Sequence, residues 1–386
     1  HLRIMPVCRI QRVLLQDTKI APINQPVRQF YFFNPLHKLF MQHMVLEVLM
    51  TKAVFFDVED YEKNFLQKKC NGKYDYYLLP NPLNDISKLD DDIKDADIIS
   101  CFTTSRVSGD ILKNFSNLKL IALRSVGFNH IDLDYCKEHN ITVVNTPNYG
   151  NKSVAEFAFG LMLDVCRKIT KACIDFRDMN INPLETIGIE LGGKTVGIIG
   201  LGAIGAEFAR ISYGFDMNIL GYDINQRDEL VDKYEVEYTD FDTLLSKSDF
   251  ISLHSPLTKD NFHMFSEDSF KKMKPSSIII NTARGELINT QALYNALINK
   301  EISGAGLDVL ESEETISDTD YLSDISMLNS EKLKDTVLNT RLFQMENVII
   351  TPHIAYNTKE AINRILSTTI ENIDAFISGK IKNKVS

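Results

Sequence analysis

Short apolar runs alternate with helical patterns from Thr51 to the end of the chain. Apolar runs of about four to eight residues, bounded by turns, are typical of strands that are buried on both faces of a parallel sheet. Because helical patterns separate these runs, we expect an α/β protein with two doubly wound parallel sheets. The first series predicts strands at 53–58, 97–102, 118–125 and 141–145, and the second at 195–199, 218–222, 249–253, 278–281, 304–307 and 348–351.

Two helical segments flank the second series. The segment 151–171 carries apolar residues around nearly its whole circumference, so we expect either a domain-spanning helix or a subunit interface. The segment 358–377 is amphipathic, and we expect it to pack back onto the first domain. Between Glu311 and Asn347 the pattern predicts a long loop with polar and amphipathic pieces.

Residues 1–50 differ from the rest of the chain. They contain six Lys or Arg against two acidic residues, with scattered prolines and no sustained periodicity. Met50 is followed at once by an apolar strand and looks like a genuine start. We therefore expect 1–50 to be a non-native or disordered extension rather than an organellar targeting arm, since serine is scarce there.

Composition narrows the class of protein. A chain of 386 residues exceeds the usual size of a single core, so two domains are expected. The net charge of −10 excludes a global basic field for nucleic acid or an anionic membrane. The six cysteines form no CxxC pair and show no zinc-finger spacing, so we expect reduced thiols, no metal site and a cytoplasmic protein. No apolar run reaches the length of a membrane span.

A glycine-rich motif follows the first strand of the second series. Gly200, Gly202 and Gly205 form GxGxxG between a strand and a helix. Their expected roles are a tight turn, close approach to a pyrophosphate and close helix–strand packing. Alone the motif is weak, but Asp223 ends the next strand near the position expected for a ribose-binding acid. We favour this role over a solvated strand-end carboxylate, and so NAD over NADP, although Arg227 lies nearby.

Charged side chains follow three further strands. Arg284 comes just past an apolar strand. There it can bind a carboxylate with its planar guanidinium or simply lie on the surface, and taken alone its position favours neither interpretation. Asp308, Glu311, Glu313 and Glu314 follow another strand, and His353 follows the last. A core histidine and solvated acids are the ordinary interpretations. Together with a dinucleotide loop, however, three such strand ends favour an acid–base site at the crevice beyond the strands.

At these residues the chain resembles the D-isomer-specific 2-hydroxyacid dehydrogenases, most closely the D-lactate dehydrogenase branch. The resemblance runs from about Thr51 to the C-terminus. Seven motifs occur in order, which is far more specific than any one alone. They lie at 124–132, 145–156, 200–205, 253–258, 281–285, 307–313 and 351–355.

The resemblance implies a fold and a division into domains. A flavodoxin-like substrate domain would comprise 51–149 plus 353–386. A Rossmann-type NAD-binding domain, 150–352, would be inserted into it. Within that division we expect a homodimer that pairs through the coenzyme domains, because one subunit could hardly cover the apolar helix 154–169.

The resemblance also implies residue roles. Arg284 would bind the substrate carboxylate and carbonyl, and His353 would be the general acid, paired with Glu313 in preference to Glu311 or Glu314. Val126, Gly127 and Tyr149 would line the substrate pocket. Ala203 departs from the Arg or His often found at its position. Expected cofactor contacts are Gly200, Gly202, Ala203, Ile204, Gly205, Asp223, Ser255, Pro256, Asn261, Thr282, Ala283 and Asp308.

The predicted activity is reversible reduction of a small 2-keto acid, with pyruvate as the lead substrate. Dehydrogenases of bulkier 2-hydroxy acids, phosphoglycerate or phosphite remain alternatives. A different class, a dinucleotide-sensing corepressor, is also open, but the complete Arg284, Glu313 and His353 set favours the enzyme.

Overall fold

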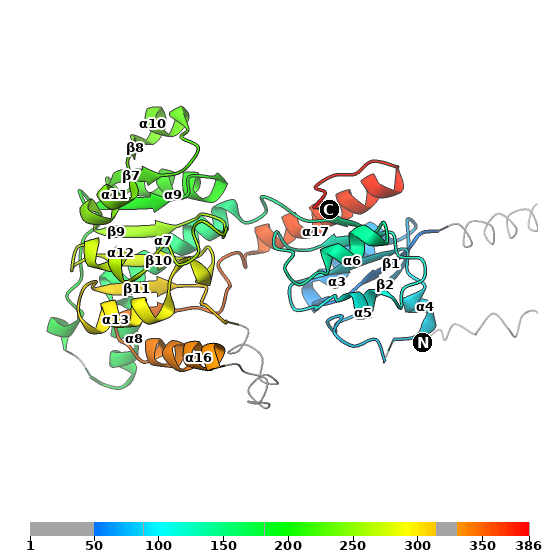
Figure 1. The fold of residues 1–386 in the computed structure, drawn as a ribbon, viewed down its shortest axis with the longest axis horizontal. Coiled ribbons are helices and arrows are strands. Elements are labelled where there is room, and N and C mark those ends of the chain that lie inside the picture. The colour runs from blue at the N-terminus through cyan, green and yellow to red at the C-terminus, as the bar shows by residue number, and fades with distance from the viewer. Residues whose placement is uncertain (1–49, 88, 181, 314–329, 386) are drawn as a thin grey trace, which may run out of the picture. The chain divides into compact units, whose positions relative to one another are not determined.

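The structure, a computed structural model, describes residues 50–87, 89–180, 182–313 and 330–385. The expected extension, apart from Met50, lies outside the described residues, as do Glu314 and part of the loop predicted after Glu311. In the described part of the chain the strands form two parallel sheets, one of five strands and one of seven (Figure 1). The predicted α/β fold with two parallel-sheet domains is therefore confirmed.

The first sheet has the order β2-β1-β3-β4-β5, which is a flavodoxin-like order. The last helix of the chain packs against β4 and α3 of this sheet. The strands are β1 (Lys52–Phe55), β2 (Asp75–Leu78), β3 (Ile98–Cys101), β4 (Leu120–Leu123) and β5 (Thr142–Val144). The helices are α3 (Asp60–Cys70), α4 (Asp91–Lys94), α5 (Gly109–Leu112), α6 (Leu133–Glu138) and α17 (Lys359–Ile377).

Both faces of this sheet are buried, which explains its continuous apolar strands. Leu120 and Ala122 of β4 join a core that includes Ile370 of α17. Ile121 and Leu123 point the other way and join a second core. Since successive residues of a strand point to opposite faces, helices on both faces demand apolar residues at every position.

The second sheet has the order β12-β11-β10-β9-β6-β7-β8. Its strands are β6 (Thr195–Ile199), β7 (Asn218–Tyr222), β8 (Glu237–Tyr238), β9 (Phe250–Leu253), β10 (Ile278–Asn281), β11 (Gly304–Leu307) and β12 (Val348–Ile350). Its helices are α7 (Asn151–Arg167), α8 (Ile169–Arg177), η2 (Pro183–Thr186), α9 (Ala203–Tyr213), α10 (Asp228–Tyr234), α11 (Phe241–Lys247), α12 (Glu267–Lys272), η3 (Gly285–Leu287), α13 (Thr290–Ile298) and α16 (Ser330–Phe343).

The strand order of the second sheet reverses at β6. The chain runs outward from β6 through β7 to β8, then returns to β9 on the other side of β6. Loops leaving β6 and β9 therefore diverge, and the crevice beyond their carboxyl ends is the usual ligand site of a doubly wound sheet. The glycine-rich motif begins directly after β6, at this switch point.

Several elements differ from the sequence-based expectation. β2 and β8 were not predicted, because both are half-exposed edge strands without an apolar run. The helix expected over 151–171 ends at Arg167, since Lys168 adopts a left-handed conformation (φ 53°). Part of the stretch expected to be a loop forms α16.

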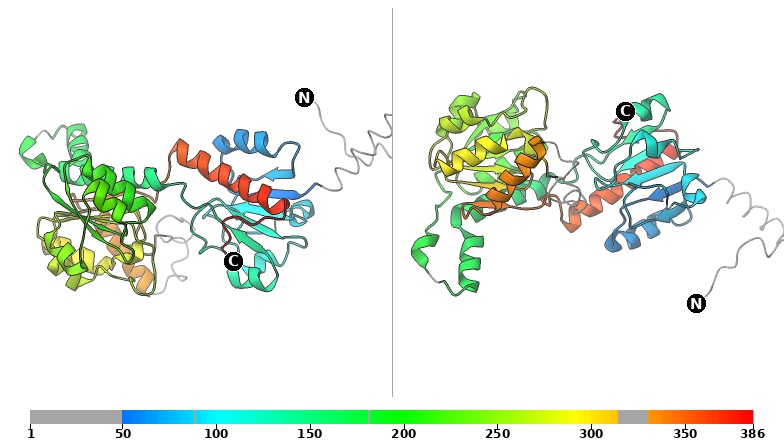
Figure 2. Two further views of the ribbon diagram at one scale, coloured as in Figure 1. Left: turned by 90° about the horizontal axis from the view of Figure 1, so that it is seen from above. Right: turned by 60° about the horizontal axis from the view of Figure 1, so that its bottom comes forward.

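The α7 helix is largely covered within the chain. It packs within the chain against α9, β10, β11 and β12, and a polar stripe that includes Lys152, Glu156 and Arg167 stays exposed. Val154, Phe157 and Leu163 stay partly exposed, and the expected subunit interface at this helix stays a prediction. Exposed apolar residues gather on the segment after it, α8 and η2, which stands away from the second sheet (Figure 2). We call residues 168–180 and 182–190 the arm.

Other findings concern membranes and thiols. Within the described ranges, no helix combines the length and the apolar character needed to cross a membrane. All five described cysteines are free thiols, and only Cys173 is exposed. Burial raises the pKa of Cys70 and Cys101 to about 12.

Candidate active site

The glycine-rich turn brings β6, α9 and the end of β9 into direct contact. Gly200 has φ +87°, and a Cβ there would lie 2.6 Å from the Ser255 nitrogen. A Cβ on Gly205 would lie 2.0 Å from the Gly200 carbonyl oxygen. Both positions therefore exclude a side chain, and α9 begins immediately beside the end of β6.

The N-terminus of α9 is open to a phosphate. Gly202 is its N-cap, supplies no side-chain hydrogen bond, and has nothing within 4 Å of where a Cβ would stand. The adjacent Ala203 is exposed. Free backbone N–H groups and the positive end of the helix dipole favour an anion here. The residues present thus fit the pyrophosphate of a dinucleotide.

Two buried hydroxyls near the same edge have no partner among the described residues. They are Ser255 Oγ, just after β9, and Thr282 Oγ1, just after β10. Buried polar groups are normally satisfied, so unpaired ones indicate a missing ligand or water. These two unpaired hydroxyl groups are a second observation in favour of a polar cofactor at this edge of the sheet.

Asp223 lies directly after β7 and is held against the glycine turn. Its Oδ2 accepts a hydrogen bond from the Leu201 nitrogen (2.6 Å), and its Oδ1 accepts one from the Asn225 nitrogen (2.8 Å). Each oxygen retains capacity for a ribose hydroxyl. Arg227 donates to the carbonyls of Leu201 and Gly202 (3.2 and 3.3 Å) and pairs with a glutamate, so its guanidinium is engaged.

The loop from Ser255 to Asn261 is closed by the asparagine itself. Asn261 Oδ1 accepts from the Thr258 nitrogen (2.7 Å), and its Nδ2 donates to the Pro256 carbonyl (2.8 Å). Asn261 therefore shapes this loop within the chain. Its predicted contact with the cofactor stays a prediction.

Arg284 is carried by a loop that Asn281 organises. Asn281 accepts from the Ala283 nitrogen (3.0 Å) and donates to the Arg284 carbonyl (2.8 Å). One guanidinium nitrogen donates to the Ala283 carbonyl (2.6 Å), and Arg284 forms no ion pair with any residue that the structure describes. The half-buried guanidinium is thus a cation with N–H groups left for an anion.

Asp308 shapes the turn that carries His353. Its buried carboxylate accepts from the Thr351 hydroxyl (2.6 Å) and from the nitrogens of Ile354 (3.0 Å) and Ala355 (2.8 Å). His353 itself has a left-handed backbone conformation (φ 53°). Burial raises the pKa of Asp308, whereas these hydrogen bonds oppose that shift.

The turn places His353 beside Glu313. His353 Nδ1 lies 2.8 Å from Glu313 Oε1, and both side chains are roughly half exposed. The pKa of His353 is raised, chiefly by the hydrogen bond to Glu313 and with a contribution from Asp308, while burial and Arg284 oppose the rise. Glu313 thus favours the imidazolium form of His353.

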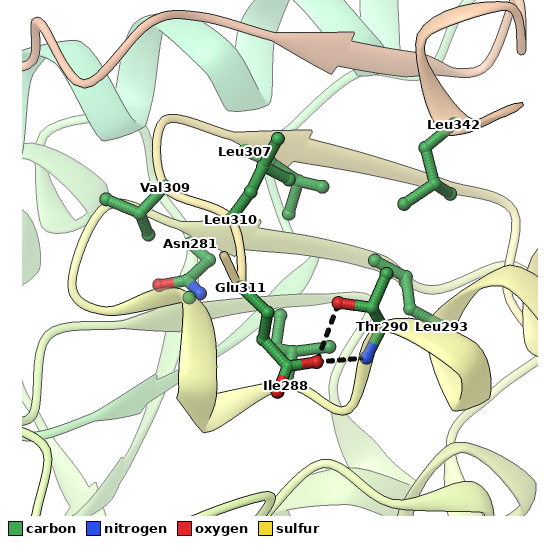
Figure 3. A pocket seen from close by; sticks show the side chains of 10 residues that line it. Asn281, Ile288, Thr290, Leu293, Leu307, Val309, Leu310, Glu311 and Leu342 are labelled. Atoms are coloured by element: carbon green, nitrogen blue, oxygen red, sulfur yellow. Dashed lines mark hydrogen bonds between the residues drawn. The ribbon is translucent and has the colours of Figure 1, made fainter. Parts of the chain in front are cut away.

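Glu311 points away from His353. Its Oε1 contacts His263 Nε2, and its Oε2 accepts from the nitrogen and the hydroxyl of Thr290 (2.7 Å each) (Figure 3). The third acid, Glu314, lies outside the described residues. Of the two described glutamates, Glu313 is the one that the structure brings to His353.

The residues expected to line the substrate pocket follow β4 and β5. Val126 is exposed, and its carbonyl accepts from Asn145 Nδ2 (2.8 Å). The Gly127 carbonyl accepts from the Ser125 hydroxyl (2.6 Å), and the Tyr149 carbonyl accepts from Arg364 Nε of α17 (2.7 Å). Side-chain bonds therefore fix the backbone of this loop.

Sequence reasoning assigned no role to Arg124 and did not find its partner. The Arg124 side chain is 1% exposed, donates to the carbonyls of Phe56 (2.6 Å) and Asp57 (2.8 Å), and faces Glu62 at 3.6 Å. Burial raises the pKa of Glu62. Arg124 comes two positions before Val126 in the sequence. The available signal was an arginine at the end of an apolar strand.

Sequence reasoning also missed His254 and His263. His254 is half-buried beside Phe208, with Nδ1 buried and Nε2 2.9 Å from the Ser252 hydroxyl. His263 contacts Glu311 across 48 positions of sequence, which no local pattern reveals. Among the described residues, no three His, Cys, Asp or Glu side chains are grouped so that they could hold a metal ion.

Comparison with known proteins agrees with this geometry. Residues 159–355 match the family model "D-isomer specific 2-hydroxyacid dehydrogenase, NAD binding domain". A D-lactate dehydrogenase of Escherichia coli (strain K12) is 35% identical over 331 residues, 85% of this chain and 98% of that protein. A glyoxylate reductase of Thermococcus litoralis is 37% identical over 296 residues, 75% of this chain and 83% of that protein.

A solved structure extends the match to three dimensions. D-lactate dehydrogenase from Aquifex aeolicus, in complex with NAD and lactic acid, superposes with a TM-score of 0.73 at 36% identity. The match covers 86% of this chain and 98% of that one. The chain therefore belongs to the D-isomer-specific 2-hydroxyacid dehydrogenases, which use NAD to interconvert 2-keto acids and D-2-hydroxy acids.

Proposed function

We propose that the chain reduces pyruvate to D-lactate with NADH, using Arg284, His353 and Glu313. The observation that carries this proposal is the His353–Glu313 pair, 2.8 Å apart, on loops that leave the same sheet edge as the Arg284 loop. The D-lactate dehydrogenase relative also aligns over a larger share of this chain than the glyoxylate reductase does.

Each side chain has a distinct task in this proposal. When bound, NADH supplies the hydride. The planar guanidinium of Arg284 pairs with the substrate carboxylate and polarises the neighbouring carbonyl. Because Glu313 engages Nδ1 of His353, Nε2 is the nitrogen that donates the proton to the carbonyl oxygen. In the reverse direction neutral His353 accepts that proton.

The remaining site assignments belong to the same proposal, as does the division into domains at 51–149 plus 353–386 and 150–352. Val126, Gly127 and Tyr149 contact the substrate. The cofactor is held by Gly200, Gly202, Ala203, Ile204, Gly205, Asp223, Ser255, Pro256, Asn261, Thr282, Ala283 and Asp308. The open α9 N-terminus and the unpaired hydroxyls after β9 and β10 support this assignment.

A panel of 2-keto acids with NADH tests the substrate. Glyoxylate, pyruvate and longer or aromatic 2-keto acids are compared by kcat/KM from the loss of NADH absorbance. We expect pyruvate to be the best substrate and the product to be the D isomer. A higher kcat/KM for glyoxylate or for a bulkier keto acid would mean that this compound, and not pyruvate, is the substrate. If none of the keto acids is turned over, a dinucleotide-sensing corepressor is favoured.

We further propose a homodimer formed through the arm, in the cytoplasm. The arm exposes Ile174, Phe176, Met179, Leu184 and Ile187 by at least half of their surface. An apolar patch of this kind on one element is typical of a protein interface. A second copy is the favoured occupant, because the arm belongs to the coenzyme-binding half, and two-fold pairing of identical patches is the commonest form of oligomer.

A further inference from the structure

A second histidine–glutamate pair lies in the NAD-binding half, outside the proposed acid–base pair. His263 and Glu311 make it, and their side chains are 28% and 11% exposed. Both oxygens of the Glu311 carboxylate have partners. One contacts His263 Nε2. The other accepts from the nitrogen and the hydroxyl of Thr290, as Figure 3 shows. A buried carboxylate is tolerated only when it is satisfied in this way.

The neighbouring Asn289 determines which nitrogen of His263 carries the proton. Asn289 is the N-cap of α13, and its Oδ1 accepts from the Ala292 nitrogen (2.9 Å). Its Nδ2 therefore faces His263 Nδ1, at 3.2 Å, and donates to it. With Nδ1 accepting, His263 donates to Glu311 through the hydrogen on Nε2. The donor and the acceptor of each hydrogen bond from Asn289 through His263 to Glu311 are thus fixed.

Glu311 also joins the loops that carry the proposed catalytic groups. It lies between Asp308 and Glu313 in sequence. A Cβ on Gly285, next to Arg284, would lie 2.1 Å from the Leu310 carbonyl carbon and 2.4 Å from the Glu311 nitrogen. The arginine loop therefore rests directly on the backbone of the Glu313 loop. The Glu311 carbonyl accepts from Asn339 of α16 (3.0 Å).

His263 ties in the loop that follows β9. Its backbone nitrogen donates to the Glu286 carbonyl (2.9 Å), next to Gly285. Its ring stacks on Phe262 with centroids 3.9 Å apart. The Glu311 carboxylate thus bonds to the segment after Asn261 and to the start of α13. The backbone of the same residue lies against the arginine loop at Gly285.

We infer that Glu311 is a positioning residue for the proposed reaction. Through its bonds to His263 and Thr290, it holds Glu313 beside His353 and keeps Arg284 correctly placed relative to both. This inference rests on the proposed function. It predicts that removing the Glu311 charge acts on the chemistry at His353 even though Glu311 hydrogen-bonds to neither His353 nor Arg284.

The fixed polarity allows a sharp test. In Glu311→Gln, one of the two carboxylate oxygens is replaced by an NH2 group, which is a donor. Whichever way the amide is turned, this NH2 group faces a donor, either on His263 or on Thr290. His263 cannot relieve this by moving its proton to Nδ1, because that proton would then face Asn289 Nδ2. Asn289→Asp supplies an acceptor there and still caps α13, so the double substitution Asn289→Asp with Glu311→Gln restores complementary bonds with reversed polarity.

The experiment measures the pH profile of pyruvate reduction and the KM values for pyruvate and NADH. The groups that act electrostatically on His353 are Glu313, Asp308 and Arg284. For Glu311→Gln we expect the alkaline limb of the reduction profile to move to lower pH and kcat/KM for pyruvate to fall roughly ten- to hundredfold. The KM for NADH should change much less, and the double substitution should regain most of the loss.

Matched variants separate the possible outcomes. Glu286→Gln removes a nearby, half-buried charge and should leave the profile unchanged. If Glu313→Gln moves the limb but Glu311→Gln does not, or if the double substitution is no better than Glu311→Gln, the positioning role is wrong while the proposed function stands. If Glu313→Gln leaves the limb in place, the acid–base pair and the role of Glu311 both fail.

A milder variant covers the case in which Glu311→Gln does not fold. His263→Phe keeps the ring packing on Phe262 and the Thr290 bonds, but removes one donor to Glu311. It should move the limb in the same direction by a smaller amount. A folded His263→Phe protein with the unmodified pH profile and unmodified kcat/KM overturns the inference.

Discussion

At the scale of single residues, the site depends on charges whose surroundings differ. Arg284 is a half-buried cation without an ion-pair partner among the described residues, whereas Arg227 is engaged by two carbonyls and a glutamate. Glu313 faces His353, but Glu311, two positions away, is enclosed by donors. The same side-chain types therefore occupy surroundings that suit binding, chemistry or scaffolding.

The guanidinium geometry of Arg284 should matter beyond its charge. Arg284→Lys keeps the cation but loses the planar fork that matches a carboxylate. We expect kcat/KM for pyruvate to fall by roughly a hundredfold, on the order of 3 kcal/mol, with the NADH dissociation constant preserved. Steady-state kinetics and NADH fluorescence titration measure both. Arg341→Lys, at an exposed position of α16, is the control, and near-normal kinetics of Arg284→Lys would mean that another cation binds the substrate.

Asp223 should set the preference for NADH over NADPH. Its carboxylate is held at the glycine turn, where it would repel a 2′-phosphate. Asp223→Ser should bring the kcat/KM values for NADH and NADPH closer together, chiefly by lowering the KM for NADPH. Asp232→Ser, on the exposed side of α10, controls for loss of a nearby charge. Equal use of both cofactors by the unmodified protein would contradict the ribose assignment.

At the scale of elements, the site is assembled where strands end. Gly200, Ser255 and Asn281 come from the carboxyl ends of three adjacent strands, β6, β9 and β10. Strand interiors are buried and apolar, so the polar residues that follow them are confined to one edge. This arrangement explains why a chain of apolar runs followed by single charged residues produces a crevice with converging polar groups.

His254 after β9, whose Nδ1 is buried, should make stability depend on pH. Burial lowers the pKa of His254 from its ordinary 6.5 to about 3. The unfolded chain therefore binds a proton below pH 6.5 that the folded protein resists. The stability contribution is complete above pH 6.5 and is lost as the pH falls from 6.5 towards 3, by up to about 1.4 kcal/mol per pH unit.

Denaturant unfolding between pH 7 and pH 5 measures this dependence. His254→Gln should show a shallower loss of the free energy of unfolding with falling pH than the unmodified protein, whatever its absolute stability. His139→Gln, at an exposed position, is the matched control. An identical slope for the unmodified protein and His254→Gln would mean that His254 is protonated or exposed in the folded protein.

Sequence patterns predicted the strands that carry an apolar run, including the edge strands β5 and β12, and missed the two edge strands that lack one. All six strands expected in the second sheet lie within one residue of their predicted bounds at each end, because apolar runs mark strands whose faces are covered. β2 (Asp-Tyr-Tyr-Leu) carries only half-buried or exposed residues, so its pattern resembles a loop. The break at Lys168 depends on a backbone conformation that no periodicity encodes.

The candidate site divides in the same way. Arg284, Glu313 and His353 could be named because each follows a strand in a recognisable motif. The His263–Glu311 bond joins residues 48 positions apart, and the Arg124–Glu62 pair joins residues on different elements. Such contacts arise from packing, so only the three-dimensional structure reveals that these residues are paired.

At the scale of the whole molecule, the arm is the feature that a single chain leaves unexplained. None of the residues of α8, all of them described, is buried, although five of the nine are apolar. The chain returns from the arm to the end of α7, where the Ile189 nitrogen donates to the Cys166 carbonyl (2.9 Å). The end of the arm is thus joined by a backbone hydrogen bond to α7, the helix after which the arm begins.

Introducing charge into the arm should abolish the proposed dimer. Phe176→Glu with Leu184→Glu places carboxylates at residues that are 66% and 77% exposed, so the monomer fold should tolerate them. Light scattering should show a mass near twice 43.9 kDa for the unmodified protein and near 43.9 kDa for the variant. Ile298→Glu, at another exposed apolar position on α13, should remain dimeric. A stable, active monomer of the unmodified protein at micromolar concentration would refute the proposal.

The central claim is that His353, held charged by Glu313, delivers the proton in keto-acid reduction. Its raised pKa means that His353 stays protonated to higher pH than an isolated histidine, so reduction persists on the alkaline side and declines only as the pH rises through that raised pKa. Glu313→Gln keeps the size but removes the charge, and so lowers the pKa of His353.

The most direct test is therefore the pH profile of kcat/KM for pyruvate reduction by the unmodified protein and by Glu313→Gln. The account predicts that the alkaline limb moves to lower pH in Glu313→Gln, and that the limb for D-lactate oxidation moves the same way because neutral His353 forms sooner. His353→Gln should depress both directions at every pH while NADH still binds. Limbs that coincide in the unmodified protein and Glu313→Gln would contradict the account.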